Sequence, residues 1–329
     1  MPWSWSIALE TVVAGERLIV AAAQIAPVWL DRDATLARVV GAIDQAAVAG
    51  AELVAFGECL VPGYPFWVDR TDGARFDSTL QADLYAHYVD QAVDIEAGHL
   101  ENVCEAARRC AVFVVLGVLE RPQSRGESVY ASAVVIGKDG RIQSVQRKLM
   151  PTYEERLVWA TGDGHGLRTH ALGRFTVGAL NCWENWMPLA RASLQVQGED
   201  LHVAIWPGNP RNTREITRFM AIEGRSYVLS VAGLMREEDW PENLPHAATL
   251  KQAAADLPWA RGGSCLAGPD GNWLIEPVTD QSGVFTAEID HAKVRRARHK
   301  FDPSGHYSRP DVFQLKINRD RQQIGDFED

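Results

Sequence analysis

Three polar residues stand at points where the pattern of buried strands breaks. Glu58 follows the apolar run Leu53–Phe56 with only Gly57 between them, and Cys182 directly follows the strand-like run Phe175–Asn181. Lys148 follows the second strand of a predicted hairpin. Because ligands of open α/β sheets collect at the carboxyl ends of strands, the first two positions are natural candidates for a site.

Taken singly, each residue has an ordinary structural interpretation. Cys182 could be a small buried side chain, Glu58 a loop carboxylate and Lys148 a surface charge. Together they would supply a reaction. A thiol needs a base to become a nucleophile, and a carboxylate in an apolar pocket has a raised pKa and accepts that proton. An ammonium group nearby restrains that shift and stabilises negative charge on a substrate nitrogen or oxygen. The set therefore predicts the nucleophile, base and electrophilic stabiliser of an acyl-type hydrolase.

Strand and helix signals alternate over most of the chain, and no repeat or linker divides it. The apolar stripe at about 34–49 predicts a helix with Asp31 or Asp33 as N-cap, and a longer helical region is predicted over Leu80–Ala111. Shorter helices are predicted at Leu189–Gln197 and Thr213–Glu223. Strands are predicted at Leu18–Ala26, Glu52–Gly57, Val112–Leu119, Tyr130–Ile136, Arg141–Val145, Phe175–Asn181, Leu201–Trp206, Tyr227–Gly233, Cys265–Gly268, Asn272–Glu276 and Gly283–Ile289.

The turns Lys138-Asp139-Gly140 and Pro269-Asp270-Gly271 predict two hairpins among these strands. Parallel and hairpin-joined strands with helices outside indicate a layered α/β fold. Helices on one face of each of two sheets would leave the sheets to pack on each other, which gives four layers. The pattern alone does not separate that arrangement from a doubly wound single sheet. We expect one domain over residues 1–329.

Composition excludes several classes of partner. The 329 residues carry a net charge of −10, which disfavours nucleic acid because phosphate binding needs surplus Lys and Arg. The basic run Lys293–Lys300 is short and is interpreted as a solvated helix face. The apolar stretch Leu18–Leu30 is too short to span a bilayer and contains Gln24, so no membrane partner is expected.

The cysteines and the N-terminus indicate the compartment. Five cysteines without metal-ligand spacing predict free thiols and no metal site, which fits a reducing cytoplasm. The leader MPWSWSIALE lacks the basic region and cleavage site of a signal peptide. We therefore expect a cytoplasmic protein.

Four segments around these residues resemble motifs of one family. They read GECLVPGYPFW from Gly57, RKLMPTYEERLVW from Arg147, NCWENWMPLAR from Asn181 and GHYSRPDVF from Gly305. In this order they resemble the nitrilase superfamily, and more closely its true nitrilase branch. The resemblance implies an α-β-β-α sandwich with Cys182 as nucleophile, Glu58 as general base and Lys148 as electrophilic stabiliser. The second glutamate of the family matches Glu155, with Glu154 as its neighbouring alternative.

The resemblance also implies a reaction without metal or organic cofactor, whose partners are a small-molecule nitrile and water. Members of the family associate through an outer helical layer. We therefore expect a homodimer or a larger spiral homo-oligomer, with the C-terminal segment of about 290–329 in subunit contacts. Candidate substrate-binding residues are Tyr64, Thr152, Trp67, Trp183 and Trp186. The aromatic members of this set are equally compatible with core or interface packing.

Alternative functions remain at this point. An amidase or carbamoylase of the same superfamily is disfavoured by the C-W-E and P-T-x-x-E-R segments. A cyanide hydratase or dihydratase is disfavoured because Asn185 stands where cyanide-degrading relatives tend to have His. A catalytically idle scaffold is disfavoured because every matched position is intact. The continuation NWMPLAR resembles nitrilases of aromatic and arylacetonitrile substrates, but the preferred nitrile and the ratio of acid to amide stay open.

Overall fold

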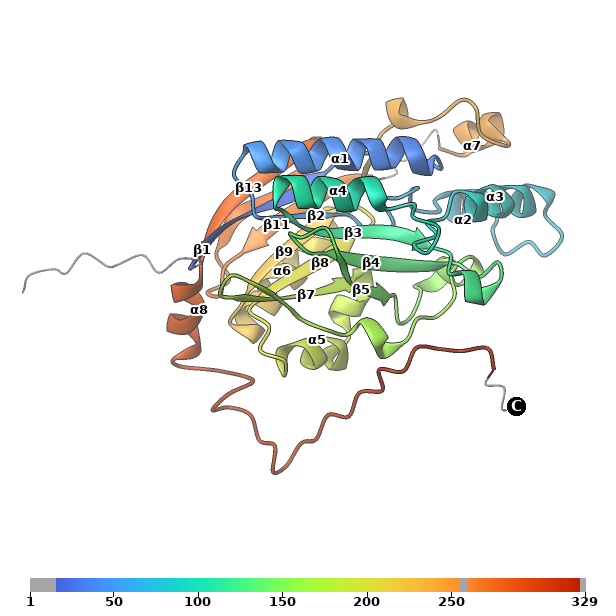
Figure 1. Ribbon diagram of the computed structural model, residues 1–329. Coiled ribbons are helices and arrows are strands. Elements are labelled where there is room, and N and C mark those ends of the chain that lie inside the picture. Colours follow the sequence, from blue (N-terminus) through green and yellow to red (C-terminus); the bar gives the residue numbers. More distant parts are fainter. Residues whose placement is uncertain (1–15, 255–259, 326–329) are drawn as a thin grey trace, which may run out of the picture.

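The computed structural model describes residues 16–254 and 260–325 and arranges them in four layers (Figure 1). Two β-sheets pack face to face. Helices α1 (Arg32–Val48) and α4 (Glu101–Cys110) lie side by side on the outer face of the first sheet. Helices α5 (Pro188–Gln195) and α6 (Pro210–Gly224) cover the second. The predicted α-β-β-α sandwich is confirmed, and the alternative of one doubly wound sheet is excluded. The leader at residues 1–15 lies outside the described residues.

The first sheet has parallel strands in its centre and antiparallel strands on both sides. Residues of β1 alternate between two cores: Val20 points to the other sheet, and Ala21 points to the covering helices. This period of two is why the apolar runs could be recognised in the sequence. The order is β13 (Gly283–Asp290), β1 (Arg17–Gln24), β2 (Leu53–Phe56), β3 (Phe113–Glu120), β4 (Tyr130–Ile136) and β5 (Ile142–Arg147).

The second sheet is built around three parallel strands whose carboxyl ends lie at one edge. Cys182 directly follows β7 at this edge. The strand order in the second sheet is β10 (Leu234–Met235), β11 (Ala260–Ala267), β9 (Tyr227–Ala232), β8 (Leu201–Trp206), β7 (Phe175–Asn181) and β6 (His170–Leu172), with β12 (Trp273–Thr279) paired to β11.

Helix α1 forms where the sequence predicts it. Its buried stripe includes Leu36, Val39 and Ile43, which pack on the first sheet. Of the two predicted N-caps, Asp31 has the role: its carboxylate accepts a hydrogen bond from the N–H of Ala34 at 2.9 Å. The basic run near the C-terminus falls on α8 (His291–Arg298), where Val294 is buried and most charged side chains face solvent.

The helical region predicted over Leu80–Ala111 is not helical throughout. The structure has α3 (Thr79–Asp90) and α4, separated by an irregular segment. In that segment Val93 donates its N–H to the carbonyl of Leu119 at 2.7 Å and forms a bridge with Glu120. The backbone of Val93 therefore pairs with the C-terminal end of β3, and this pairing ends helix α3.

The remaining helices are short. Within the described residues, no helix is long and apolar enough to cross a membrane. The remaining helices of the described residues are α2 (Trp67–Arg70), α7 (Ala247–Ala254), and the 3-10 helices η1 (Gln123–Arg125), η2 (Tyr153–Leu157), η3 (Gly164–Gly166), η4 (Cys182–Trp186) and η5 (Glu237–Asp239).

After α8 the chain is extended and runs back along the molecule (Figure 1). Its last described part docks on the loop before β6. The guanidinium of Arg321 lies 2.9 Å from the carboxylate of Asp163, and the carbonyl of Arg319 lies 3.1 Å from Nδ1 of His165. Part of the segment at about 290–329 therefore packs on its own chain. The expected role of this segment in subunit contacts stays a prediction.

Two glycines allow the segment that carries Glu58 to lie against its neighbours. A Cβ on Gly117 in β3 would lie 2.1 Å from the carbonyl oxygen of Gly57 and 2.9 Å from Cα of Glu58. A Cβ on Gly57 would in turn lie 2.8 Å from the amide nitrogen of Gly233. These neighbours are backbone atoms, so a side chain can be accommodated only by moving the chain.

We therefore expect Gly117→Ala to lower the free energy of unfolding by about 1–3 kcal/mol, the usual cost of overpacking. Urea denaturation measures this change. The matched control is Gly41→Ala in α1, where no atom lies within 4 Å of the new Cβ. There alanine should raise stability by about 0.5–1 kcal/mol, since glycine destabilises a helix interior. Equal stability of the two variants would contradict the packing described.

Candidate active site

The four residues predicted for catalysis converge on one buried cluster. Nζ of Lys148 lies 2.9 Å from Oε1 of Glu58 and 2.6 Å from Oε2 of Glu155. Sγ of Cys182 and a carboxylate oxygen of each glutamate all lie within 4.8 Å of one another. Each of these residues is at most 3% exposed. A thiol, two carboxylates and an ammonium thus share a single small volume.

Strand ends from both sheets place these side chains. Glu58 follows β2 by one residue, and its N–H donates to the carbonyl of Trp206 at the end of β8 at 3.1 Å. Lys148 directly follows β5, and its N–H donates to the carbonyl of Ala131 in β4 at 2.8 Å. The first of these hydrogen bonds ties the two sheets together beside the cluster.

Cys182 stands on a strained turn. Its φ is +46°, a left-handed conformation that side chains other than glycine rarely adopt. The turn is stabilised by the capping-box pair Asn181 and Glu184, in which the Glu184 carboxylate accepts the N–H of Asn181 at 2.7 Å at the start of η4. The strand thereby stops abruptly, and the thiol is directed toward the carboxylates.

Glu155 is held by three donors. Its Oε2 accepts from Nζ of Lys148 at 2.6 Å and from the N–H of Thr152 at 2.5 Å, and its Oε1 accepts from the hydroxyl of Tyr64 at 2.7 Å. Glu58 differs. Among the residues that the structure describes, neither of its oxygens receives a hydrogen bond of normal geometry, and its one close partner is the ion contact with Lys148. Glu58 is therefore the carboxylate that is free to accept a proton.

Burial and mutual charge set the protonation states. Burial raises the pKa of Glu58 to about 8, against the opposing charge of Lys148. Burial also raises the pKa of the Cys182 thiol, and the charge of Glu58 adds to this. For Lys148 burial acts in the opposite direction, but the negative charges of Cys182, Glu58 and Glu155 raise its pKa well above the usual value. One ammonium thus faces two carboxyl groups and a thiol, and a proton remains to be shared between Glu58 and Cys182.

By distance alone, the sulfur and the two carboxylates would also suit a metal ion. The Lys148 ammonium, however, already lies in hydrogen-bonding range of both carboxylates and supplies the positive charge between them. The cluster therefore has a cation of its own. That the reaction needs no metal or organic cofactor stays a prediction.

A groove of about 430 Å³ lies beside this cluster. Three predicted substrate-binding residues line it: Thr152, Trp183 and Trp186, with both indoles about half exposed. Tyr64 instead bonds Glu155. Trp67 is fully buried, and its ring packs edge-on against Tyr88 with centroids 4.7 Å apart. The structure therefore does not bring Trp67 to the groove. The full lining is Met150, Pro151, Thr152, Tyr153, Arg156, Trp183, Trp186 and Met187.

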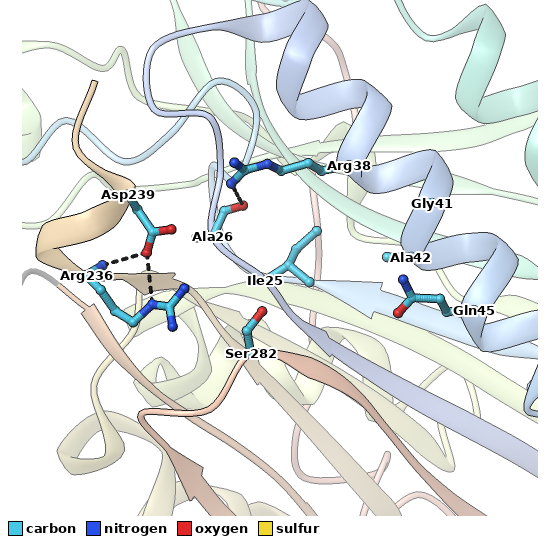
Figure 2. Close-up of a pocket in the computed structure, with 9 residues that line it drawn as sticks. All are labelled: Ile25, Ala26, Arg38, Gly41, Ala42, Gln45, Arg236, Asp239 and Ser282. Carbon is cyan, nitrogen blue, oxygen red and sulfur yellow. Dashed lines mark hydrogen bonds and ion pairs between the residues drawn. The ribbon is translucent and has the colours of Figure 1, made fainter. Parts of the chain in front are cut away.

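Another hollow, of about 390 Å³, lies between α1 and the turn at η5 (Figure 2). Its arginines already have partners: Arg236 donates to Asp239, and Arg38 donates to the carbonyl of Ala26 at 3.0 Å. None of the four converging residues lines either hollow, but the groove is lined by Trp183, which directly follows Cys182, and by Thr152, whose N–H donates to Glu155. The candidate active site is therefore the buried cluster and the groove beside it.

The sequence predicts no role for Glu184 and predicts substrate binding for Tyr64, whereas in the structure both residues hold the cluster in shape. A signal for Glu184 was present, because an Asn followed three residues later by Glu is a helix-start pattern. Asn181 and Glu184 have this spacing, as do Thr152 and Glu155, and both pairs form capping boxes. The hydrogen bond of Tyr64 left no such signal.

Known proteins resemble this chain over most of its length. The family model for carbon–nitrogen hydrolase matches residues 19–299. Nitrilase 2 from an unknown prokaryotic organism is 36% identical over 298 residues, which cover 90% of this chain and 91% of that protein. An aliphatic nitrilase of Rhodococcus rhodochrous is 36% identical over 91% of this chain and 79% of its own length. An arylacetonitrilase of Aspergillus kawachii is 33% identical over 91% of each chain.

Solved structures share the fold. The NitFhit protein of C. elegans superposes with a TM-score of 0.71 at 18% identity, over 95% of this chain and 70% of that one. An amidase from Nesterenkonia sp. gives 0.63 at 16% identity, over 88% and 97%. The chain described here belongs to the carbon–nitrogen hydrolase family, and within that family it groups with the nitrilases.

The protonation states lead to a test that needs no substrate. If Glu58 takes the proton of Cys182, alkylation of this thiol by iodoacetamide should rise about tenfold per pH unit up to about pH 8. The sign follows from the base form, which is populated only as pH rises through the raised pKa. Peptide mass spectrometry of timed samples measures the rate at each cysteine.

The matched variant is Glu58→Gln, which keeps the shape of the side chain and removes the base. It should slow alkylation of Cys182 by at least about tenfold near pH 8. The half-buried thiol of Cys104 serves as control in the same sample and should react at an unchanged rate. Equal rates at Cys182 in the two proteins would exclude Glu58 as its base.

Proposed function

We propose that this chain is a nitrilase that hydrolyses an organic nitrile to the carboxylic acid and ammonia. The observation that carries the proposal is the convergence of a buried thiol, a carboxylate in ion contact with an ammonium, and that ammonium, in a member of this family. Relatives that are 32–36% identical over most of the chain carry nitrilase names. No observation favours an amidase, a cyanide-degrading enzyme or an idle scaffold.

The first half of the reaction forms a covalent intermediate. Glu58 accepts the proton of Cys182, and the thiolate attacks the nitrile carbon so that a carbon–sulfur bond forms. One π-bond of the nitrile breaks, its electron pair moves to nitrogen, and Glu58 returns the proton there to give a thioimidate. The ammonium of Lys148 and the N–H of Trp183 stabilise the charge that develops on nitrogen.

The second half releases both products. Glu58 accepts a proton from water while the oxygen attacks the thioimidate carbon. The π-bond between carbon and nitrogen breaks, its electron pair moves to nitrogen, and nitrogen takes the proton from Glu58. This gives a tetrahedral intermediate with a hydroxyl and an amine, and the hydroxyl proton then passes through Glu58 to the amine. Protonation of the amine lets ammonia leave with the electron pair of the carbon–nitrogen bond, which produces a thioester. A second water then releases the acid and restores the thiol. Early expulsion of the thiol from the first tetrahedral intermediate would release an amide instead. Glu155 supports these steps by fixing Lys148.

Substitution of the nucleophile tests the mechanism. Cys182→Ala should abolish ammonia release, while Glu58→Ala and Lys148→Ala should each lower kcat/KM by at least about 10²-fold. A coupled assay for ammonia measures the rate, and circular dichroism verifies the fold. Cys104→Ala, which lies in α4 on the outer helical layer, is the matched control and should keep full activity. More than a few per cent of activity in Cys182→Ala would rule out this mechanism.

We propose aromatic nitriles or arylacetonitriles as the preferred substrates. The supporting observation is the groove, whose wall includes the indoles of Trp183 and Trp186 and the thioethers of Met150 and Met187. Flat apolar surfaces of this kind favour a planar aromatic group. The relatives carry both aliphatic and arylacetonitrile names, so they support either class. Ammonia release across a panel of aliphatic, aromatic and arylacetonitriles decides between them, and preference for short aliphatic nitriles would contradict the proposal.

We propose further that the protein acts in the reducing cytoplasm as a homodimer or larger spiral homo-oligomer. All five cysteines are free thiols, which supports the compartment. Large apolar side chains are exposed on the layer of η4, α5 and α6, which supports an interface there. The exposed members are Trp186, Leu189, Val196, Phe219 and Ile222.

A charge on this layer should weaken the assembly. Leu189, 70% exposed on α5, is suited to the test because Leu189→Glu leaves the core untouched. We expect the mass from light scattering during gel filtration to fall toward that of one chain. The control is Val48→Glu, at the end of α1 on the opposite helical layer, where the side chain is 91% exposed. If Leu189→Glu keeps the mass of the unmodified protein, the interface lies elsewhere.

A further inference from the structure

Glu184 is a buried carboxylate that the mechanism does not use. It lies in the 3-10 helix that begins at Cys182, and only 1% of its surface is exposed. Its side chain points back across the end of β7 toward the segment that follows β5. It therefore lies between the two chain segments that carry the thiol and the ammonium.

The two oxygens of Glu184 bind different segments. Oε2 accepts from the N–H of Asn181, the residue before Cys182, at 2.7 Å. Oε1 accepts from the N–H of Leu149, the residue after Lys148, at 2.6 Å. A third donor, Nε2 of Gln146, reaches Oε1 at 3.3 Å. One rigid carboxylate thus links a backbone group next to the nucleophile with a backbone group next to the lysine.

These contacts fix the charge of Glu184. Both oxygens accept hydrogen bonds from N–H donors, and a carboxylic acid proton would have to point at one of those donors. Although burial raises the pKa of Glu184, the N–H groups of Leu149 and Asn181 oppose that effect and stabilise the anion. The charge also acts at a distance, since Glu184 contributes to raising the pKa of Glu58.

We propose that Glu184 is a positioning residue that holds the Cys182 turn and the Lys148 segment in one reactive geometry. The proposal rests on the nitrilase function proposed above. Glutamine at this position has the same shape but one oxygen, so its amide group would face the N–H of either Asn181 or Leu149. The two segments would then separate by a fraction of an ångström to relieve that contact, and misplacement of this order costs up to about 10²-fold in rate.

The test compares Glu184→Gln with the unmodified protein. We expect kcat for nitrile hydrolysis to fall about 10- to 100-fold with KM changed less than about threefold. The acid side of the pH profile should also move to lower pH, because one negative charge that opposes ionisation of Glu58 is gone. A residue that only stabilises the fold would change the amount of active protein and leave the pH profile in place.

The matched control is Asp200→Asn. Asp200 is also a buried carboxylate that accepts a backbone N–H, that of Thr176 at 2.7 Å, and a side-chain nitrogen of His291 at 2.9 Å. It lies at the start of β8, at the opposite end of the parallel strands from Cys182. The Asp200→Asn protein should lose stability as the Glu184→Gln protein does, but its kcat and the pH profile of nitrile hydrolysis should stay unchanged.

The outcomes separate this proposal from the function it rests on. If the unmodified protein releases no ammonia from any nitrile, the nitrilase function fails, and the alkylation rate of Cys182 still tests the positioning. That rate should fall at least about tenfold in Glu184→Gln and stay unchanged in Asp200→Asn. If nitriles are hydrolysed and Glu184→Gln keeps the kcat, pH profile and alkylation rate of the unmodified protein, the positioning role is excluded.

A second variant covers the case in which Glu184→Gln does not fold. Gln146→Met removes the side-chain nitrogen that donates to Glu184 and to the carbonyl of Arg147, and it also removes a buried oxygen that has no hydrogen-bond partner among the described residues. Methionine has a similar volume, so the packing of the core is retained. We expect kcat to fall about three- to tenfold with KM unchanged, the scale of losing one hydrogen bond that orients the carboxylate. An unchanged kcat in soluble Gln146→Met would overturn the proposal.

Discussion

One buried ammonium must offset more negative charge than it carries. Lys148 lies within 2.9 Å of two carboxylates and shares its pocket with the Cys182 thiol. Charges removed from water are costly unless they are paired, so the pocket resolves the imbalance by keeping a proton. Glu155 accepts hydrogen bonds on both oxygens, whereas Glu58 has no donor beyond the ion contact among the residues that the structure describes. Burial raises the pKa of Glu58 to about 8, so Glu58 gains and loses a proton close to neutral pH. Its ionised form can accept a proton from the thiol or from water, and its protonated form can return that proton to the substrate nitrogen.

The fold holds the residues of this pocket in fixed positions. Strand ends of both sheets meet there, and the N–H of Glu58 bonds the carbonyl of Trp206 across the sandwich. Gly57 and Gly117 let three backbone segments approach closely enough for that contact. The left-handed turn at Cys182 is a strained conformation, and the capping box of Asn181 and Glu184 compensates for it locally. Hydrogen bonds of backbone groups hold the chain segments around the pocket rigid. Packing of side chains alone would not fix these segments in the same way.

Much of the fold follows from local pattern. The strands at Tyr130–Ile136, Phe175–Asn181 and Leu201–Trp206 have the bounds that the apolar runs predict. The catalytic positions could be proposed because chemistry-bearing residues interrupt such runs. The features that the sequence does not reveal depend on contacts between residues that lie far apart in the chain. The helix predicted over Leu80–Ala111 is broken by pairing of Val93 with β3, and Tyr64 bonds Glu155 only because folding brings them together.

The central claim is that the pKa of Glu58 is raised to about 8, and that the form ionised above this pH is the base for Cys182. Infrared difference spectroscopy of the unmodified protein against Glu58→Gln, recorded across a pH series, observes that carboxyl group directly. The account predicts a band of a protonated carboxyl at neutral pH that disappears as pH rises through about 8, and that persists to higher pH in Lys148→Met. A Glu58 carboxylate that is already ionised at pH 6, with or without Lys148, would contradict it.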